Sequence, residues 1–180
     1  MSETTQTLTF PNSPAEMDLA SFLDTFGGVY EHSPWVAQTA WESGLTEKHN
    51  TSAGLSKQMM VAIADADRKS LLDLINAHPD LAGKAAVNGE LTAESTSEQS
   101  GAGISECTPE EFEQFQTFND AYKAKFGFPF IMAVKGSNRH MILGSFAERI
   151  PNDPDTEFKT AVAEINKIAR FRLDAIASGE

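Results

Sequence analysis

LLDLINAHPDLAGK, residues 71–84, is the stretch around which the chain is organised, because it predicts a helix that stops at a histidine. Its leucines and isoleucine recur at the spacing of one helix face, and Asp67 stands where it can cap the first turn. Pro79 ends the helix, since a proline ring disfavours the α conformation in the residue before it and has no N–H to donate. His78 is therefore expected in a stiff turn just beyond the helix end. An imidazole there suits proton transfer near neutral pH, although a turn histidine without a chemical role is the commoner meaning of this dipeptide alone.

Helix signals flank this stretch on both sides. Helices are expected from a capping box at residues 13–16 to Gly27, from Ser33 and Pro34 to Gly44, over residues 52–65, from a second capping box at residues 108–111 to Phe126, over residues 138–150, and from Asp153 and Pro154 to Ala177. The run FPFIMAV, residues 128–134, follows a helix stop and is expected to be extended and buried. A single such run cannot form a sheet, and no long alternation of apolar and polar residues occurs. The sequence therefore predicts an all-α, single-domain bundle of about seven to nine helices over residues 13–178, after a flexible N-terminus of residues 1–12.

Composition narrows the class of protein. The 180 residues carry a net charge of −12, which argues against a nucleic-acid surface because phosphates would repel it. No apolar run is long enough to span a membrane, and the N-terminal residues do not resemble a secretory signal. Cys107 is the single cysteine, so no internal disulfide is expected and a reducing, cytoplasmic location fits best. The apolar stripes of several helices fit either a core or the face of a homodimer.

The segment of residues 82–105 differs in character, because four glycines stand in it among small polar residues. A short helix is expected around residues 93–99. A long irregular stretch inside a compact chain is more often functional than a plain linker, so this segment is a candidate site. Glu98 lies among hydroxyl and amide side chains next to glycines. This composition suits a polar, hydrogen-bonding ligand, and it equally suits a solvated helix end.

Arg172 stands one heptad beyond Ile165, at the edge of the buried stripe expected for the last helix. A buried arginine needs a partner, either a carboxylate of the chain or an anionic ligand, whereas an arginine that snorkels to the surface needs neither. The sequence contains no HExxH, CxxC, P-loop or strand-associated GxGxxG motif, so neither a metal nor an organic cofactor is expected.

Four segments, in this order along the chain, resemble one known family: INAHPDLAGK, SxxEQSGAGI, FxxFNDAYKAKFGFPFIMAVKG and EINKIARFRL. The family is that of the 2-oxo-4-hydroxy-4-carboxy-5-ureidoimidazoline (OHCU) decarboxylases of the ureide pathway, and the resemblance extends over residues 17–176. It implies an all-helical fold and a cofactor-free carboxy-lyase that decarboxylates OHCU to (S)-allantoin in urate (purine) catabolism. The implied partner is this small molecule, with no nucleic acid and no membrane.

The resemblance also implies roles for individual residues. His78 would donate a proton, Glu98 would be the second catalytic group, and Arg172 matches the family's arginine near the end of the chain. Substrate contacts would come from Pro79, Ser95, Thr96, Ser97 and Gln99, and from the backbone of Phe130, Ile131, Met132, Ala133 and Val134. The partner of the arginine would then be the substrate and not a carboxylate of the chain, so that lysine in its place would hardly change the melting temperature of the free protein.

Two other interpretations use the same residues. One is a non-catalytic helical module that binds ureides, and the other is a ureide hydrolase with Glu98 as base. The presence of His78, Glu98 and Arg172 together counts against the non-catalytic module. Measuring the CO₂ and the ammonia released from OHCU distinguishes all three interpretations.

Overall fold

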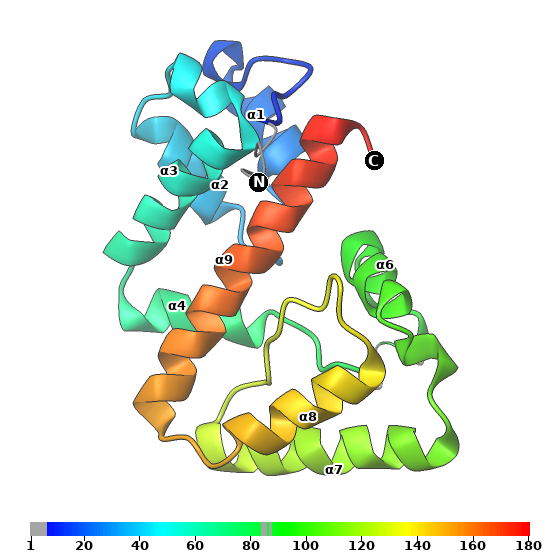
Figure 1. The fold of residues 1–180 in the computed structure, drawn as a ribbon. Helices are drawn as coiled ribbons and strands as arrows, with labels where there is room; N and C mark the ends of the chain where they lie inside the picture. The colour runs from blue at the N-terminus through cyan, green and yellow to red at the C-terminus, as the bar shows by residue number, and fades with distance from the viewer. Residues whose placement is uncertain (1–6, 84–85, 87) are drawn as a thin grey trace, which may run out of the picture. The chain divides into compact units, whose positions relative to one another are not determined.

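The computed structural model describes residues 7–83, 86 and 88–180, and the chain forms two compact units. The first unit consists of the chain up to Leu74 together with residues 166–180, and the second consists of residues 75–165. Helices α4 (Arg68–Asn76) and α9 (Pro154–Ser178) each run from one unit into the other without a break (Figure 1). Both units therefore belong to one all-α domain, and the predicted fold class is confirmed.

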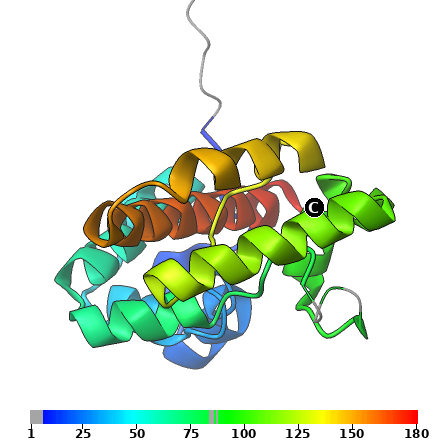
Figure 2. The same cartoon turned by 90° about the horizontal axis from the view of Figure 1, so that it is seen from below.

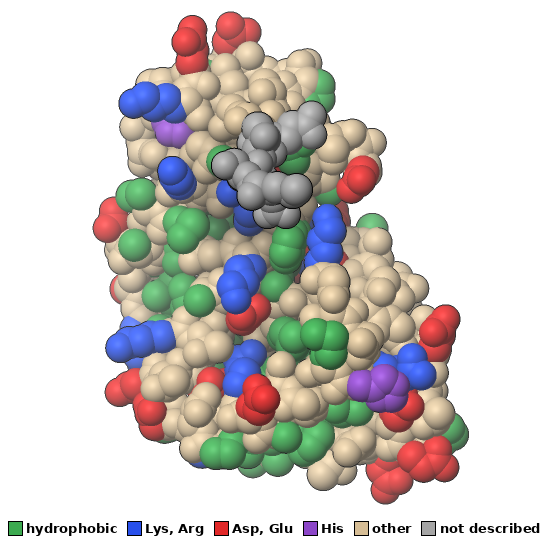
Figure 3. All heavy atoms as spheres, in the orientation of Figure 1, with side chains coloured by type: hydrophobic (Ala, Val, Ile, Leu, Met, Phe, Trp, Pro, Cys, Tyr) green, Lys and Arg blue, Asp and Glu red, His purple; other side chains and the backbone are tan. Residues whose placement is uncertain are grey.

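The described residues contain eight α-helices, and the one β-type pairing among them is an isolated bridge between Thr9 and Thr51. Besides α4 and α9 the helices are α1 (Leu19–Phe26), α2 (Trp35–Glu42), α3 (Ser52–Asp65), α6 (Ala93–Gly101), α7 (Pro109–Phe126) and α8 (Arg139–Arg149), with 3₁₀ turns at Pro14–Glu16, Glu47–Asn50 and Ile104–Glu106. None of these helices combines the length and the apolar character needed to cross a membrane. Acidic and basic side chains are interspersed on the face shown in Figure 3.

In the first unit, contacts with other residues hold the first described residues of the chain in place. The Phe10 ring packs edge-on against Phe26 with the ring centroids 4.9 Å apart, and the Phe10 N–H donates to the Asn50 carbonyl at 2.9 Å. The Ser52 N–H donates in turn to the Leu8 carbonyl at 2.9 Å. Residues 8–10 of the N-terminus expected to be flexible are therefore held in place, while residues 1–6 lie outside the described residues.

The predicted capping box at residues 13–16 is wrong. Pro14–Glu16 forms only a 3₁₀ turn, and the Ser13 side chain makes no capping hydrogen bond. Helix α1 begins after Asp18, whose carboxylate accepts a hydrogen bond from the Ser21 N–H at 2.8 Å. A carboxylate is favoured at a helix N-terminus by the helix dipole, and this hydrogen bond holds the pKa of Asp18 below its usual value.

Helix α7 in the second unit is the long green helix at the front of Figure 2, and it begins and ends at its predicted signals. The Thr108 hydroxyl accepts from the Glu111 N–H at 3.2 Å, and Gly127 ends the helix with a left-handed φ of 76°. The segment of residues 128–134 then connects α7 to α8 without helical structure and is mostly buried, as predicted. Its Phe130 ring stacks on Phe146 with the centroids 3.8 Å apart, so this segment is part of the aromatic core of the unit.

Candidate active site

His78 lies where the sequence places it, immediately after the end of a helix. Helix α4 ends at Asn76, and the His78 N–H closes the last turn by donating to the Ile75 carbonyl at 3.2 Å. The predicted cap at the other end of the helix is also present, since the Ser70 N–H donates to the Asp67 carboxylate at 2.7 Å. His78 is buried, with 9% of its surface exposed, which makes it more than a solvated turn residue.

Helix α6 turns two of the predicted contact residues inward. It forms over Ala93–Gly101, which confirms the short helix expected there. Ser95 and Gln99, one helical turn apart, are buried. The Gln99 amide binds the loop that follows His78: its Oε1 accepts from the Ala82 N–H at 3.1 Å, and its Nε2 donates to the Asp80 carbonyl at 3.4 Å. The structure thus joins the predicted Gln99 to the histidine loop.

The other predicted residues of α6 are more accessible. Glu98 is half-buried, and Thr96 and Ser97 are exposed. Because successive residues of a helix point about 100° apart, Glu98 stands beside the inward-facing Gln99 at the edge of the buried face. A carboxylate in this position can exchange protons with a ligand and with solvent.

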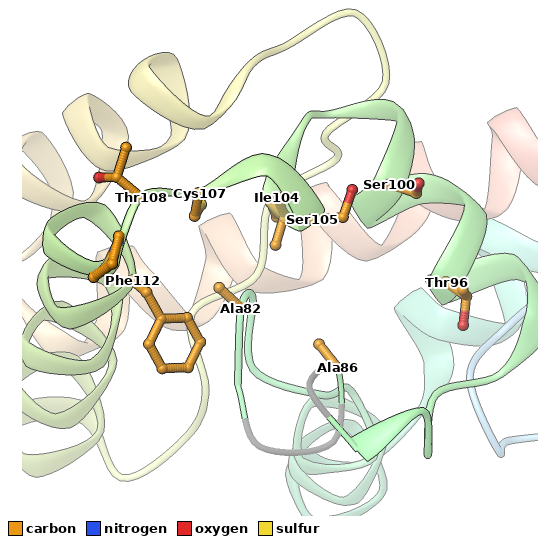
Figure 4. A pocket seen from close by; sticks show the side chains of 10 residues that line it. Ala82, Ala86, Thr96, Ser100, Ile104, Ser105, Cys107, Thr108 and Phe112 are labelled. Atoms are coloured by element: carbon orange, nitrogen blue, oxygen red, sulfur yellow. The ribbon is translucent and has the colours of Figure 1, made fainter.

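A pocket of about 590 Å³ lies on another side of α6 in the second unit. It is lined by Ala82, Ala86, Thr96, Ser100, Ile104, Ser105, Cys107, Thr108, Pro109 and Phe112 (Figure 4). Thr96 is the single predicted site residue among them. Burial and the neighbouring Glu111 raise the pKa of the Cys107 thiol, so this thiol is a poor nucleophile.

The backbone of residues 128–134 is held by acidic and basic side chains that the sequence did not single out. The Ile131 carbonyl accepts from Arg149 Nη1 at 2.7 Å, and the Arg149 guanidinium lies over the Phe130 ring at 4.2 Å. The Ala133 N–H donates to the Glu164 carboxylate at 2.9 Å. These contacts fix the conformation of the segment predicted to offer its backbone to a substrate.

Arg149 is itself anchored by a fully buried carboxylate, Glu157. Glu157 accepts from Arg149 Nε at 2.8 Å, from the Tyr122 hydroxyl at 2.7 Å and from Asn152 Nδ2 at 3.1 Å. Burial, together with the hydrogen bond to Glu157, raises the pKa of Tyr122 well above its usual range, so the phenol stays a donor. A buried carboxylate with three donors is a satisfied charge, and its loss should be costly.

We expect Glu157→Gln to lower the free energy of unfolding by about 2 kcal/mol, because a neutral amide weakens the charge-assisted bonds to Arg149 and Tyr122. Thermal unfolding followed by circular dichroism measures the change. Glu148→Gln, at an exposed position of α8, is the matched control and should shift the melting temperature by little. Equal melting temperatures for the two variants would contradict a structural role for Glu157.

Arg172 lies in the first unit and has a carboxylate partner there. Its Nη1 is 2.8 Å from Glu31 Oε2 and 3.4 Å from the Val29 carbonyl. Both side chains of the ion pair are buried, with 6% of Arg172 and 2% of Glu31 exposed. The expectation that a substrate is the partner instead of an internal carboxylate is therefore wrong for the free protein. The two residues are 141 positions apart in the sequence, so no local sequence pattern could predict that they form a pair.

The melting prediction for Arg172 changes accordingly. We expect Arg172→Lys to lower the free energy of unfolding by about 1–2 kcal/mol, because lysine cannot reproduce the planar set of donors toward Glu31 and Val29. Arg170→Lys is the control, since Arg170 pairs with Asp174 while 39% of its side chain is exposed. If both variants have the same melting temperature as the wild type, the buried ion pair does not stabilise the first unit.

The predicted site residues thus divide between the units. His78, Pro79, the α6 residues and residues 130–134 belong to the second unit, and Arg172 belongs to the first. Among the described residues, no group of three or more His, Cys, Asp or Glu side chains is arranged to hold a metal ion.

Comparison with known proteins gives this set of residues its context. The family model of OHCU decarboxylase matches residues 15–174. The chain belongs to the OHCU decarboxylase family. The match includes His78, Glu98 and Arg172, so all three predicted catalytic residues lie within the family's region of similarity.

Two proteins named 2-oxo-4-hydroxy-4-carboxy-5-ureidoimidazoline decarboxylase are among the similar proteins. The 2-oxo-4-hydroxy-4-carboxy-5-ureidoimidazoline decarboxylase of Halalkalicoccus jeotgali is 40% identical over 161 residues, which cover 89% of this chain and 88% of that protein. The protein of the same name from Haloferax volcanii is 39% identical, over 91% of this chain and 94% of that protein. The crystal structure of an (S)-allantoin synthase matches with a TM-score of 0.71 and 28% identity, over 91% of this chain and 52% of that chain. This chain therefore spans about half of the synthase chain.

Proposed function

We propose that this protein is a carboxy-lyase that converts OHCU to (S)-allantoin in urate catabolism. The observation that carries the proposal is the family match over residues 15–174, within which a buried His78 follows a proline-stopped helix. Family membership supplies the reaction class, and the buried histidine supplies a group able to perform proton transfer.

The reaction can be written with balanced atoms and electrons. OHCU carries a carboxylate and a hydroxyl on one ring carbon, and its neighbouring ring carbon bears the ureido group and a C=N bond. Breaking the bond to the carboxylate releases CO₂, and the electron pair left behind forms a C=C bond as the C=N takes up electrons. The ring nitrogen of the former C=N takes up one proton from solvent, which neutralises the charge left by the departing CO₂. The hydroxyl then loses its proton to become a carbonyl, and the neighbouring carbon gains a proton, which yields allantoin.

Protein groups would guide the two protons that move at the ring carbon and at the hydroxyl. We assign His78 as the donor that protonates the ring carbon on one face, and Glu98 as the group that accepts the hydroxyl proton. The polar ring would be held within the second unit, by Gln99, Ser95 and neighbouring residues of α6, by Pro79, and by the backbone of residues 130–134. Side-chain and backbone amide donors suit the carboxylate and carbonyl oxygens of this substrate.

Incubation with fresh OHCU tests the proposal and separates it from its alternatives. We expect the protein to release one CO₂ for each OHCU consumed, at a rate above the unaided decay measured without protein. Release of ammonia instead would identify a ureide hydrolase. Binding of OHCU without either product would identify a non-catalytic module, and either result would overturn the decarboxylase proposal.

Two further proposals concern the setting of the reaction. A cytoplasmic location is inferred from the single cysteine, and a homodimer is inferred from apolar side chains exposed on helices, namely Met60, Val61 and Met141. Light scattering during gel filtration tests the dimer. A mass of 19.5 kDa in solution, that of the single chain, would contradict it.

A further inference from the structure

Three side-chain amides converge on the loop that follows His78. Gln116 Nε2 donates to the Ala82 carbonyl at 2.7 Å, and Asn119 Nδ2 donates to the Leu81 carbonyl at 2.8 Å. Gln99 binds the same loop from α6, through the Ala82 N–H and the Asp80 carbonyl. Consecutive carbonyls of residues 80, 81 and 82 are thus bound by side chains of α6 and α7, all within the second unit.

The loop needs this support, because its backbone is held in a conformation that it would not choose alone. Ala82 has a φ of 53°, in the left-handed region that residues with a Cβ rarely adopt. The loop is also shielded from water, since 1% of Ala82 and 8% of Leu81 are exposed. If the amides were removed, the Leu81 and Ala82 carbonyls would lose the side-chain donors that satisfy them, while the Asp80 carbonyl would keep the Gly83 N–H at 3.4 Å.

Asn119 is the most deeply placed of the three amides, with 2% of its surface exposed. Its Oδ1 is buried and accepts no hydrogen bond from the described residues. A buried amide with one end unsatisfied is costly, and the hydrogen bond from Nδ2 to the Leu81 carbonyl offsets part of that cost. By contrast, the ion pair between Lys123 and Asp80 in the same loop has 42% and 26% of the two side chains exposed, and should contribute less.

We propose that Gln99, Gln116 and Asn119 form an amide clamp that positions His78 for proton transfer. The proposal rests on the proposed function for its catalytic consequence. Pro79 is the single residue between His78 and the clamped residues 80–82, and its ring fixes φ, so the orientation of the clamped backbone is passed to the histidine. A small displacement of a proton donor from its reacting position lowers the rate of proton transfer, although the donor itself is still present. Gln116 and Asn119 are positioning residues, because they act through His78.

Hydrogen–deuterium exchange on the free protein tests whether the amides hold the loop, and it needs no substrate. The variants are Asn119→Leu and Gln116→Met, which keep side-chain size and remove the donor. Gln114→Met, an exposed position on the same helix, is the matched control. We expect the amides of residue 78 and residues 80–83 to exchange about tenfold faster in both clamp variants and at the wild-type rate in the control. Gln116 is only half-buried, so its variant should fold even if Asn119→Leu does not.

Kinetics in two backgrounds then test whether the clamp acts through His78. In the wild-type background we expect Gln116→Met and Asn119→Leu to lower kcat about tenfold with little change in KM. In a His78→Gln background the same substitutions should cause no further loss, because the group that they position is gone. Gln114→Met should leave kcat unchanged in both backgrounds.

The outcomes are distinct. Unchanged exchange in both clamp variants would overturn the clamp itself, whether or not the protein decarboxylates OHCU. Faster exchange with unchanged kcat, or an equal loss of kcat in both backgrounds, would overturn the positioning of His78. Absence of decarboxylation by the wild type would overturn the proposed function and leave the exchange result standing as a test of the loop.

Discussion

His78→Gln is expected to lower the turnover of OHCU by a factor of about one hundred or more, the usual scale for the loss of a proton-transfer group. Glutamine keeps a hydrogen-bonding side chain of similar reach but cannot donate and regain a proton near neutral pH. The residue lies after the end of α4 and not on its apolar face, so the fold should be retained. Steady-state kinetics on fresh OHCU, with the unaided decay subtracted, give the effect.

The matched control for this prediction is His140→Gln. His140 is exposed on α8, in the same unit as His78, and is expected to tolerate the change without loss of turnover. Thermal unfolding of both variants establishes that they are folded. Near wild-type turnover in folded His78→Gln would remove His78 from the catalytic residues.

Glu98→Gln is expected to lower kcat about a hundredfold while changing KM much less. The amide preserves the size of the side chain and much of its hydrogen bonding, but it removes the charge and the ability to accept a proton. Since Glu98 is half-buried at the edge of the inward face of α6, the substitution should not unfold the helix. Measurement of kcat and KM over a range of OHCU concentrations separates the two effects.

Glu94→Gln provides the comparison for Glu98, because Glu94 lies one turn earlier on the same helix and is exposed. Its substitution should leave both kinetic constants close to those of the wild type. A change confined to KM in Glu98→Gln would make Glu98 a binding group, and the proton transfer assigned to it would have to come from another residue.

Local signals predicted much of this fold. Helix α3 occupies Ser52–Asp65 and α7 ends at Gly127, as expected, because caps and helix-stopping glycines act over a few residues. The turn at His78 was predictable for the same reason, since Pro79 restricts its immediate neighbour. Where two local signals competed, the prediction failed: Ser13 was expected to cap the first helix, and Asp18 caps it instead.

The parts of the site that depend on distant residues could not be predicted from the sequence. The partner of Arg172 is Glu31, and its identity depends on how the first unit packs. The amide side chains that bind the loop after His78 lie 17 to 38 positions further along the chain than the loop residues they contact. In the sequence, a buried Gln or Asn on a helix cannot be distinguished from a polar surface residue. Only burial distinguishes Asn119, and burial follows from tertiary structure.

We expect the protein to form (S)-allantoin from OHCU by stereospecific protonation after loss of CO₂. The most direct test follows circular dichroism of the product together with CO₂ release, using freshly prepared OHCU. We expect the signal of (S)-allantoin to appear in proportion to the CO₂ released, faster than in the reaction without protein, and to be largely lost with His78→Gln. Racemic allantoin formed at the unaided rate in the presence of folded wild-type protein would contradict the claim.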